Sequence, residues 1–514
     1  MRSPPRSCPL LLAPLVVLLG ACTPVALDPI VTASTGMGTA SGTDAGSSTP
    51  TGSAASLDSS DSDTGSPTPT GSASSSGGPL PDLPGEDTGE DLLTCAVAGT
   101  CNQLDILLVV DNSGSMGEEQ QNLAAQFAKL VDRLRTLKDA QGQPVGADVN
   151  IMVTTTDVGH LLCTPYYKPD YMPSNGAPVA TPCTERLERF SAVGANAPVV
   201  PEACTANCIE GGIAAPVDPF IHFDLATHNI VGADGIGDPA ADALACIAPQ
   251  GIDGCGMEAP LEAMLRALDH DAAWNQGDKP FLREGGVLAI VLLTDETDCS
   301  TEHFEYFDPN HKNDPEFTKY WPDLPNMPGV KGAPTSAVCW NASMTCADDD
   351  ADGVYESCVA EDKEPLFPRS RYTDLLASGF EAAGKPVFML VLAGVPSVTA
   401  HDPEAPHGPV AGGVAALVHR QWQPSDILPN DPKTPADKQY DFGIGPGCSN
   451  AATGQAIPPG RIRDVCEALN LADDPDMPGD QAELRCCIES ICDASFGGAV
   501  DCLADMLAQR LTAD

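Results

Sequence analysis

The sequence predicts an α/β fold with a doubly wound, mostly parallel sheet. Three apolar segments (106–110, 287–293 and 386–393) run continuously instead of alternating with polar residues, as in strands buried on both faces. Segments with apolar residues at helical spacing lie between them. Such alternation of strands and helices is typical of an open sheet with helices on both faces.

The remaining elements follow in order from the same patterns. Residues 148–155 predict a second strand, parallel to the first because a helix connects them. Residues 220–223 predict an edge strand, and 489–492 predict a short strand near the end. Inward-facing apolar residues predict helices at 123–137, 261–268, 372–383, 462–469 and 496–511. We expect one globular domain over 92–514, with irregular disulfide-rich insertions at about 158–250, 298–368 and 396–458.

The N-terminus has the features of an export signal. Arg2 and Arg6 precede an apolar run at 10–19 that is too short to span a bilayer. The following Leu-Gly-Ala-Cys resembles a bacterial lipobox, and this resemblance implies removal of 1–21 and acylation of Cys22. It also implies an outer-membrane lipid anchor, on the cell surface or the periplasmic face. Ordinary signal cleavage near Ala21 is the alternative.

Residues 22–91 consist almost entirely of Ser, Thr, Gly, Pro, Asp and Ala. A segment with so few large apolar side chains cannot bury enough surface to offset the entropy of ordering it. We therefore predict a disordered linker that holds the globular domain away from the membrane. No later stretch is long and apolar enough to cross a bilayer.

The chain is strongly acidic, with 72 Asp and Glu against 26 Lys and Arg and a formal net charge of −46. Nucleic acid is not an expected partner, because the chain has too few Lys and Arg to form the basic surface that binds phosphates. The charge favours solubility and cation binding.

The cysteine count predicts disulfides. Of 20 cysteines, 18 remain once Cys8 and Cys22 are set aside, an even number in a chain expected to be exported. Zinc is the alternative, but it requires tight Cys or Cys/His clusters, which Cys204, Cys208 and the vicinal pair at 486–487 do not supply. Two disulfide pairings are expected from position in the sequence. Cys95 would pair with Cys101 before the first strand, and Cys346 would pair with Cys358.

The strongest candidate site follows the first apolar strand. Asp111, Ser113 and Ser115 alternate just beyond its carboxyl end, where α/β sheets place their sites. Oxygen-only donors suit a hard cation such as Mg²⁺, Mn²⁺ or Ca²⁺. The alternative is a Ser/Gly turn that caps a helix and binds no metal.

With the strand before it and the amphipathic helix after it, this motif resembles the metal-ion-dependent adhesion site (MIDAS) of von Willebrand factor type A (VWFA) domains. The resemblance covers about 102–157, 254–298 and 370–395 and implies a doubly wound sheet. It also implies that Asp295, which ends Leu-Leu-Thr-Asp, acts on the cation through a water. Asp157 and Asp298 are candidates to support the ligands, or else exposed loop acids.

One segment departs from the family pattern. The family supplies a Thr hydroxyl from a second loop, whereas residues 254–260 contain no Thr or Ser, and Glu258 is the only side chain there that could reach a cation. An added carboxylate would bind the ion tightly. It would also partly neutralise the ion and hinder capture of an acidic ligand.

A second candidate site lies in the middle insertion. Asp348, Asp350 and Asp352 precede Gly353 in a D-x-D-x-D-G pattern typical of calcium loops, and Glu356 could supply a later ligand. The twelfth position is Val359 and not Glu, so the loop is not an EF-hand. A solvated acidic turn is the alternative.

No catalytic motif was found, since the chain lacks G-x-S-x-G, H-E-x-x-H and a phosphate-binding Gly-rich loop, and its nine histidines are scattered. We therefore do not expect an enzyme. The expected function is divalent-cation-dependent binding of a protein or cell-surface ligand. The alternative is a structural envelope lipoprotein in which the metal only stabilises the fold.

Overall fold

The computed structural model describes residues 101–160, 162–163, 172–193, 199–208, 215–232, 237–429, 431–471 and 482–512. The predicted signal peptide, Cys22, the linker and Cys95 lie outside the described residues.

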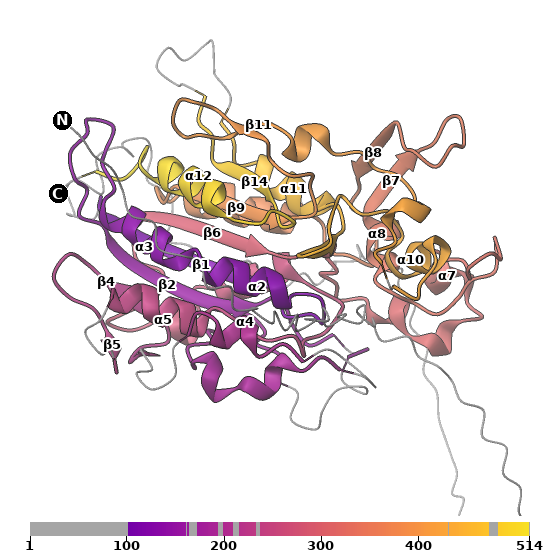
Figure 1. Cartoon of the computed structure of the whole chain (residues 1–514), viewed down its shortest axis with the longest axis horizontal. Helices are drawn as coiled ribbons and strands as arrows, with labels where there is room; N and C mark the ends of the chain where they lie inside the picture. The colour runs from indigo at the N-terminus through magenta and orange to yellow at the C-terminus, as the bar shows by residue number, and fades with distance from the viewer. Residues whose placement is uncertain are drawn as a thin grey trace, which may run out of the picture.

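A six-stranded sheet forms the centre of the described structure (Figure 1). All neighbouring strands are parallel except the edge strand β4, which is antiparallel to β2. In spatial order the strands are β4 (Ile221–Phe223), β2 (Asp148–Thr155), β1 (Gln103–Val110), β6 (Val287–Leu293), β9 (Val387–Ala393) and β14 (Cys486–Ser490). Numbered along the chain, this order is 3-2-1-4-5-6, the doubly wound arrangement whose direction reverses between β1 and β6.

Helices cover both faces of the sheet, so the strands are buried on both sides as their continuous apolar runs predict. Ile106 and Leu108 of β1 face one layer, and Leu107 and Val109 face the other. The first layer contains α2 (Gly117–Ala124), α3 (Phe127–Arg135), α5 (Pro239–Ile247) and α12 (Gly497–Leu507). The second contains α6 (Pro260–Ala267), α9 (Ser370–Thr373), the π-helix η6 (Asp374–Glu381) and α11 (Gly460–Glu467).

Several predicted elements have different bounds in the structure. The helix expected at 123–137 is divided into α2 and α3, and Gln126 N donates to Leu123 O at the division. The helix expected at 372–383 begins earlier as α9 and continues as η6. The last short strand is β14, which begins before the expected 489, and α11 begins before the expected 462.

The predicted first insertion, at about 158–250, includes α5, which is part of the layer that covers the sheet and not irregular structure. Seven of its nine residues are buried, and Asp238 caps its first turn by accepting from Ala240 N. The rest of this insertion contains short elements: η1 (Cys183–Glu185), η2 (Leu187–Phe190), α4 (Glu202–Thr205), β3 (Ala215–Pro216) and β5 (Ile230–Val231). One further short turn, η3 (Ala273–Asn275), follows α6.

The other two insertions are also made of short elements. The second holds η4 (Phe304–Phe307), η5 (Pro309–His311), α7 (Pro315–Thr318), α8 (Ala337–Ser343), β7 (Met344–Ala347) and β8 (Ser357–Ala360). The third holds β10 (Ala400–His401), β11 (Pro409–Ala411), η7 (Gly413–Ala416), η8 (Pro424–Asp426), α10 (Pro435–Phe442), β12 (Cys448–Asn450) and β13 (Gly454–Ala456). Small separate cores stabilise them, such as the cluster around Trp321 and the one around Trp340.

The predicted disulfide framework is confirmed, because every cysteine in the described residues is bonded. The pairs between described cysteines are Cys163–Cys255, Cys183–Cys204, Cys208–Cys246, Cys299–Cys339, Cys346–Cys358, Cys448–Cys492, Cys466–Cys486 and Cys487–Cys502. So many disulfides indicate an extracytoplasmic protein. Among the helices described, none is long and apolar enough to cross a membrane.

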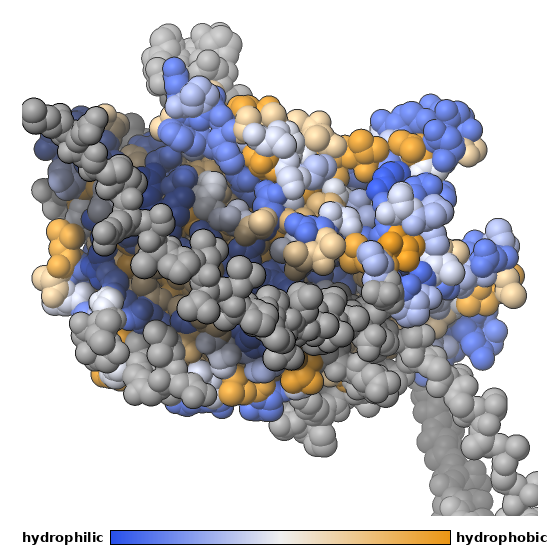
Figure 2. Space-filling model, viewed as in Figure 1, coloured by the Kyte–Doolittle hydropathy of each residue, from blue (hydrophilic) through white to orange (hydrophobic). Residues whose placement is uncertain are grey.

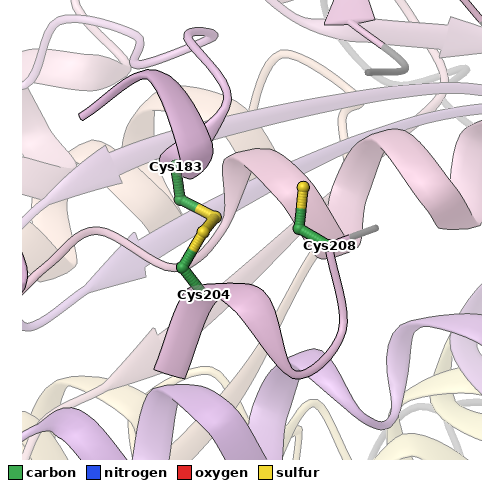
Figure 3. Close-up of side chains that lie close together, drawn as sticks. All are labelled: Cys183, Cys204 and Cys208. Carbon is green, nitrogen blue, oxygen red and sulfur yellow. A yellow bond between two sulfur atoms is a disulfide. The ribbon is translucent and has the colours of Figure 1, made fainter. Parts of the chain in front are cut away.

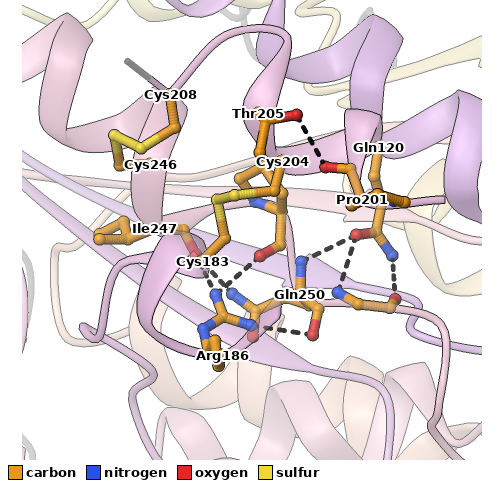
Figure 4. Close-up of a disulfide and its surroundings, with 12 residues drawn as sticks. Gln120, Cys183, Arg186, Pro201, Cys204, Thr205, Cys208, Cys246, Ile247 and Gln250 are labelled. Atoms are coloured by element: carbon orange, nitrogen blue, oxygen red, sulfur yellow. Dashed lines mark hydrogen bonds between the residues drawn. A yellow bond between two sulfur atoms is a disulfide. The ribbon is translucent and has the colours of Figure 1, made fainter. Parts of the chain in front are cut away.

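One group of cysteines resembles a metal site but is not one in this structure. The sulfur atoms of Cys183, Cys204 and Cys208 lie within 4.8 Å of one another. Figure 3 shows Cys183 bonded to Cys204, and Figure 4 shows Cys208 bonded to Cys246. Their thiols are therefore not available as zinc ligands. Beside these disulfides, the Arg186 guanidinium donates to the backbone carbonyls of Ile247, Pro249 and Gln250. These hydrogen bonds hold the segment that follows α5 (Figure 4).

Candidate metal centre

The candidate centre lies where the winding of the sheet reverses. Asp111 directly follows β1, and Asp295 follows β6 after one intervening residue, Thr294. These two strands are neighbours, and Asp111 N continues their pairing by donating to Leu293 O at 2.9 Å. Ligands of doubly wound proteins bind in the crevice outside the carboxyl ends of the strands at this reversal.

The Asp-x-Ser-x-Ser turn brings its three polar side chains together. One Asp111 oxygen accepts from Ser113 N at 2.8 Å, and the other accepts from Thr294 Oγ1 at 2.6 Å. The hydroxyls of Ser113 and Ser115 are 3.2 Å apart. Asp111 is fully buried. The turn therefore presents a carboxylate and two hydroxyls to one region, as the sequence pattern predicts.

Asp295 faces the same region from β6. Its side chain is 5% exposed and is hydrogen-bonded to the Ser115 side chain, while its Oδ1 has no hydrogen-bond partner in the described structure. Burial, followed by the charge of Asp111, raises the pKa of Asp295 to about 8. Burial raises the pKa of Asp111 to about 6. Two buried carboxylates that repel each other are an environment that a cation would stabilise.

Glu258, in the second loop, is close enough to Asp111 for the two charges to act on each other. It is fully buried, and Thr156 Oγ1 donates to its Oε2. Its Oε1 has no hydrogen-bond partner among the residues described. Burial, followed by the charge of Asp111, raises its pKa well above the ordinary value. Thr156, which directly follows β2, therefore holds one oxygen of Glu258 in place.

Neighbouring segments hold the second loop in place. Gly254 N donates to Asn112 O at 2.8 Å, and a Cβ at Gly254 would lie 2.3 Å from the Asn112 side chain. Cys299 N donates to Glu258 O at 2.6 Å. Only glycine at position 254 allows this approach between the first and second loops.

Asp157 and Asp298 are buried, which corrects the prediction that they are exposed loop acids. Asp157 is 1% exposed and accepts from Cys255 N at 3.2 Å. Asp298 is also 1% exposed and accepts from Ser300 Oγ at 2.6 Å and from Leu261 N at 3.3 Å. Both carboxylates therefore fix the backbone on either side of Glu258, consistent with a supporting role.

Two buried acids near the centre were not predicted. Glu119 of α2 is 2% exposed and Glu296 is 5% exposed, and one carboxylate oxygen of each lacks a hydrogen-bond partner in the described part of the chain. Burial raises the pKa of both Glu119 and Glu296, and the negative charge of Asp295 raises it further. Glu119 lies four residues before the inward-facing Leu123, so helical spacing could have identified it. Glu296 had only its position beside Asp295 as a signal.

The third insertion covers this end of the sheet. Ile457 N donates to Asp295 O at 2.7 Å, and a Cβ at Gly454 would lie 3.1 Å from Glu119 Oε1. The hairpin β12–β13 that carries Gly454 is attached beyond β14 by the Cys448–Cys492 disulfide. The centre is therefore enclosed on this side.

The predicted calcium loop gathers only part of its predicted ligand set. Carboxylate oxygens of Asp348, Asp350 and Glu356 lie within 4.8 Å of one another at the tip of the hairpin β7–β8, which projects from the body of the protein and has a hydrophilic surface (Figures 1 and 2). Asp352 is not in this group, and its side chain accepts from Val354 N at 2.8 Å. Cys346–Cys358 closes the loop as expected.

The sheet-edge centre is less compact than this loop. Within the described residues, Asp111, Asp295 and Glu258 do not form a group with all three carboxylates within 4.8 Å of one another. A single ion could therefore contact some of them directly and the others through water. Comparisons with known protein families, with characterised proteins and with solved structures gave no significant match.

Proposed function

We propose that the chain is an exported lipoprotein with a VWFA-like domain that binds a ligand in a divalent-cation-dependent way. One observation carries the proposal: the chain folds the predicted donors Asp111, Ser113, Ser115, Asp295 and Glu258 toward the reversal point between β1 and β6. They come from three separate segments, and all of them offer oxygen.

The chemistry of these donors supports a hard cation. Carboxylate and hydroxyl oxygens suit Mg²⁺, Mn²⁺ or Ca²⁺, and no Cys or His belongs to this group. Oxygens of Glu258 and Asp295 are buried without hydrogen-bond partners in the described structure. An unpartnered buried carboxylate is costly, and a bound cation would remove that cost. The partner would be a protein or cell-surface ligand, with an acidic group as the natural ligand for an open position on the ion.

A second candidate function is structural, with the ion only stabilising the top of the sheet. The enclosure of the centre favours it, since Asp111, Glu258 and Asp295 are at most 5% exposed and the third insertion lies against Asp295. In this case the protein would be an envelope component whose cation no partner touches.

A binding experiment separates the two candidates. The purified protein is used to capture envelope components in Mg²⁺, Mn²⁺, Ca²⁺ or EDTA, with Asp111→Ala and the exposed-site control Asp271→Ala in parallel. Cation-dependent capture by the parent and the control, but not by Asp111→Ala, is the result expected of a binding protein. Capture that is equal in EDTA would leave only the structural role.

Glu258→Thr tests the unusual second loop in the same assay. The substitution restores the hydroxyl and removes one negative charge, so the ion should bind less tightly and attract acidic groups more strongly. We expect a higher cation requirement together with stronger binding of acetate as a simple carboxylate probe. An unchanged cation requirement would mean that Glu258 does not contribute to the centre.

The β7–β8 loop is proposed as a separate calcium site, formed by Asp348, Asp350 and Glu356. Asp348 also shapes the loop, because its two oxygens accept from Asp352 N and Gly353 N, both at 3.1 Å. Its exposed position fits a stabilising ion better than a ligand-binding one. The lipid anchor at Cys22 remains part of the proposal.

A further inference from the structure

A strap formed by residues 445–457, which include β12 and β13, crosses the carboxyl edge of the sheet. The disulfide Cys448–Cys492 fixes it just beyond β14. Further along, Ile457 N donates to Asp295 O at 2.7 Å, which fixes it beyond β6. The strap therefore extends from the edge strand of the sheet to the reversal point.

Close contacts hold the strap against the sheet between these two points and beyond them. A Cβ at Gly394, directly after β9, would lie only 2.2 Å from Ile457 O. At the turn of the strap, a Cβ at Gly454 would lie 3.1 Å from Glu119 Oε1 of α2. The strap thus contacts the ends of β14, β9 and β6 and then helix α2. The third loop, residues 294–298, is buried throughout.

The first and second loops, in contrast, are partly accessible to solvent. In the first loop, which follows β1, Ser115 and the glycine before it are half-buried. In the second loop, residues 254–260, Gly256 and the methionine after it are half-buried, and the other residues are buried. The two loops touch nearby, where Gly254 N donates to Asn112 O at 2.8 Å. The accessible residues of both loops therefore lie within three residues of this contact.

Ser115 connects this accessible side with the proposed ion donors. It is the one half-buried member of that set, because the other four donors are at most 5% exposed. Its Oγ is 3.2 Å from Ser113 Oγ, and Ser113 N donates to Asp111 at 2.8 Å. A group that arrives from solvent would therefore meet the donor set at Ser115 first.

We propose that the ligand approaches the ion from the side of Ser115, between the first and second loops, and that Gly256 limits the size of the acidic group that can enter. The inference rests on the proposed cation-dependent binding and adds the class of ligand. A ligand moving along the strand axes would meet the strap instead.

The surroundings of Gly256 fit this role. In the described part of the chain, no heavy atom lies within 4 Å of a Cβ built at Gly256, and its φ is not in the left-handed region. A side chain there would leave the fold intact and would occupy the approach. The expected ligand is therefore a carboxylate on a slender group, such as an acidic side chain on an extended peptide segment, and not an acid on a broad, flat surface.

Thiol labelling tests the accessible side without any metal. Every cysteine in the described residues is disulfide-bonded, so an added cysteine would be the reactive thiol there. Iodoacetamide should label Gly256→Cys at least about tenfold faster than Thr297→Cys, because access controls the rate and Thr297 is 3% exposed in the third loop. Equal rates would show that the strap does not shield the third loop and would overturn the inference.

Calorimetry with acetate tests the role of Gly256 in the full chain, in Mg²⁺, Mn²⁺ or Ca²⁺. Gly256→Leu should weaken acetate binding at least about tenfold and Gly256→Ala less than about threefold, because the larger side chain occupies more of the approach. The matched control is Ala451→Leu, which adds the same side chain to an exposed position of the strap and should change nothing. Gly256→Ala also serves if Gly256→Leu does not fold.

The possible failures are distinguishable. If the parent and Gly256→Leu bind acetate equally well, the proposed approach is wrong and the cation-dependent binding stands. Weaker acetate binding in Ala451→Leu than in Gly256→Leu would place the approach on the side of the strap, with the same consequence. A parent that binds no acetate with any of the three cations would instead remove the proposed ligand binding itself.

Discussion

Asp111 is the residue on which the candidate centre depends most. It is fully buried, and its two oxygens bind the turn that follows β1 and the end of β6. Its charge and those of its neighbours Asp295 and Glu258 repel one another, and all three side chains are buried. The residue therefore links the charge of the centre to the stability of the sheet.

This link gives the first prediction. A cation that binds only the native state at about 100 times its dissociation constant adds about 2.7 kcal/mol, or roughly 3 °C in melting temperature for a domain of this size. Chelation should therefore lower the melting temperature of the parent, and Asp111→Ala should abolish the response. Thermal melts in Mg²⁺, Ca²⁺ and EDTA measure this, with Asp271→Ala as the control. An Asp111→Ala variant that responds like the parent would place the ion elsewhere.

His160 supports a prediction that involves no metal. The ring is 2% exposed between Phe304 and Phe307, Nδ1 accepts from Leu162 N at 3.2 Å, and burial lowers its pKa to about 3. Below pH 6.5 the unfolded chain binds a proton at His160, whereas the folded chain leaves this imidazole neutral until the pH approaches 3. The free energy of unfolding should therefore fall as the pH decreases from 6.5 toward 3, by about 2–3 kcal/mol at pH 4.5 from this residue.

The measurement compares urea unfolding of the parent and of His160→Asn at pH 7.5 and pH 4.5. Asparagine keeps an acceptor for Leu162 N but does not titrate in this range. We expect a smaller loss of stability on acidification in the variant. Equal losses in both proteins would show that His160 is protonated in the folded state.

The residues that sequence could identify at the centre are those with local signals. Asp111, Ser113 and Ser115 form one short motif after an apolar strand, and Asp295 ends another. Glu119 and Glu296 are different, because the covering third insertion contributes to their burial and nothing in the neighbouring sequence predicts that insertion's position. The burial of Asp157 and Asp298 was missed because each accepts from the backbone of a distant segment, at Cys255 N and Leu261 N, and no local pattern predicts that contact.

At the scale of elements, strands were easier to predict than helix boundaries. A strand buried on both faces needs a continuous apolar run, so 148–155 and 287–293 match β2 and β6. The Ala-rich segment of α5 has a weaker pattern and lies between Cys- and Pro-rich stretches, so its sequence does not distinguish it from the insertion around it. The division between α2 and α3 had no signal in the hydrophobic spacing, which continues across it.

The β7–β8 loop gives a prediction at this scale. Asp350 belongs to the group of close carboxylates, whereas Asp352 is used by the backbone of the turn. Asp350→Ala should lower the calcium stoichiometry by one, and Asp352→Ala should keep the bound ion while making the loop less rigid. Equilibrium dialysis with Ca²⁺ distinguishes them. Loss of one ion in both variants would support the ligand set expected from sequence, and loss in neither would remove the site.

At the scale of the whole molecule, the disulfides and the acidic surface agree with an extracytoplasmic protein, and the lipobox gives the remaining prediction. Cys22→Ala should move the protein from the membrane fraction to the soluble fraction, because no other membrane anchor is expected from the sequence. Cell fractionation with immunodetection measures this, and Cys8→Ala, in the predicted signal peptide, is the control. A Cys22→Ala protein that stays in membranes with unchanged mobility would show that Cys22 is not the anchor.

The doubly wound order of the sheet also has a consequence for how the protein is made. Asp111 meets Thr294, which is 183 residues later in the chain, and Ile457 must arrive before Asp295 is covered. Contacts over such long separations form slowly, because much of the chain must be ordered before they can form. A chain that emerges from its N-terminus therefore has the motif early but the assembled centre only late. Uptake of the ion would then mark the moment at which this domain has finished folding.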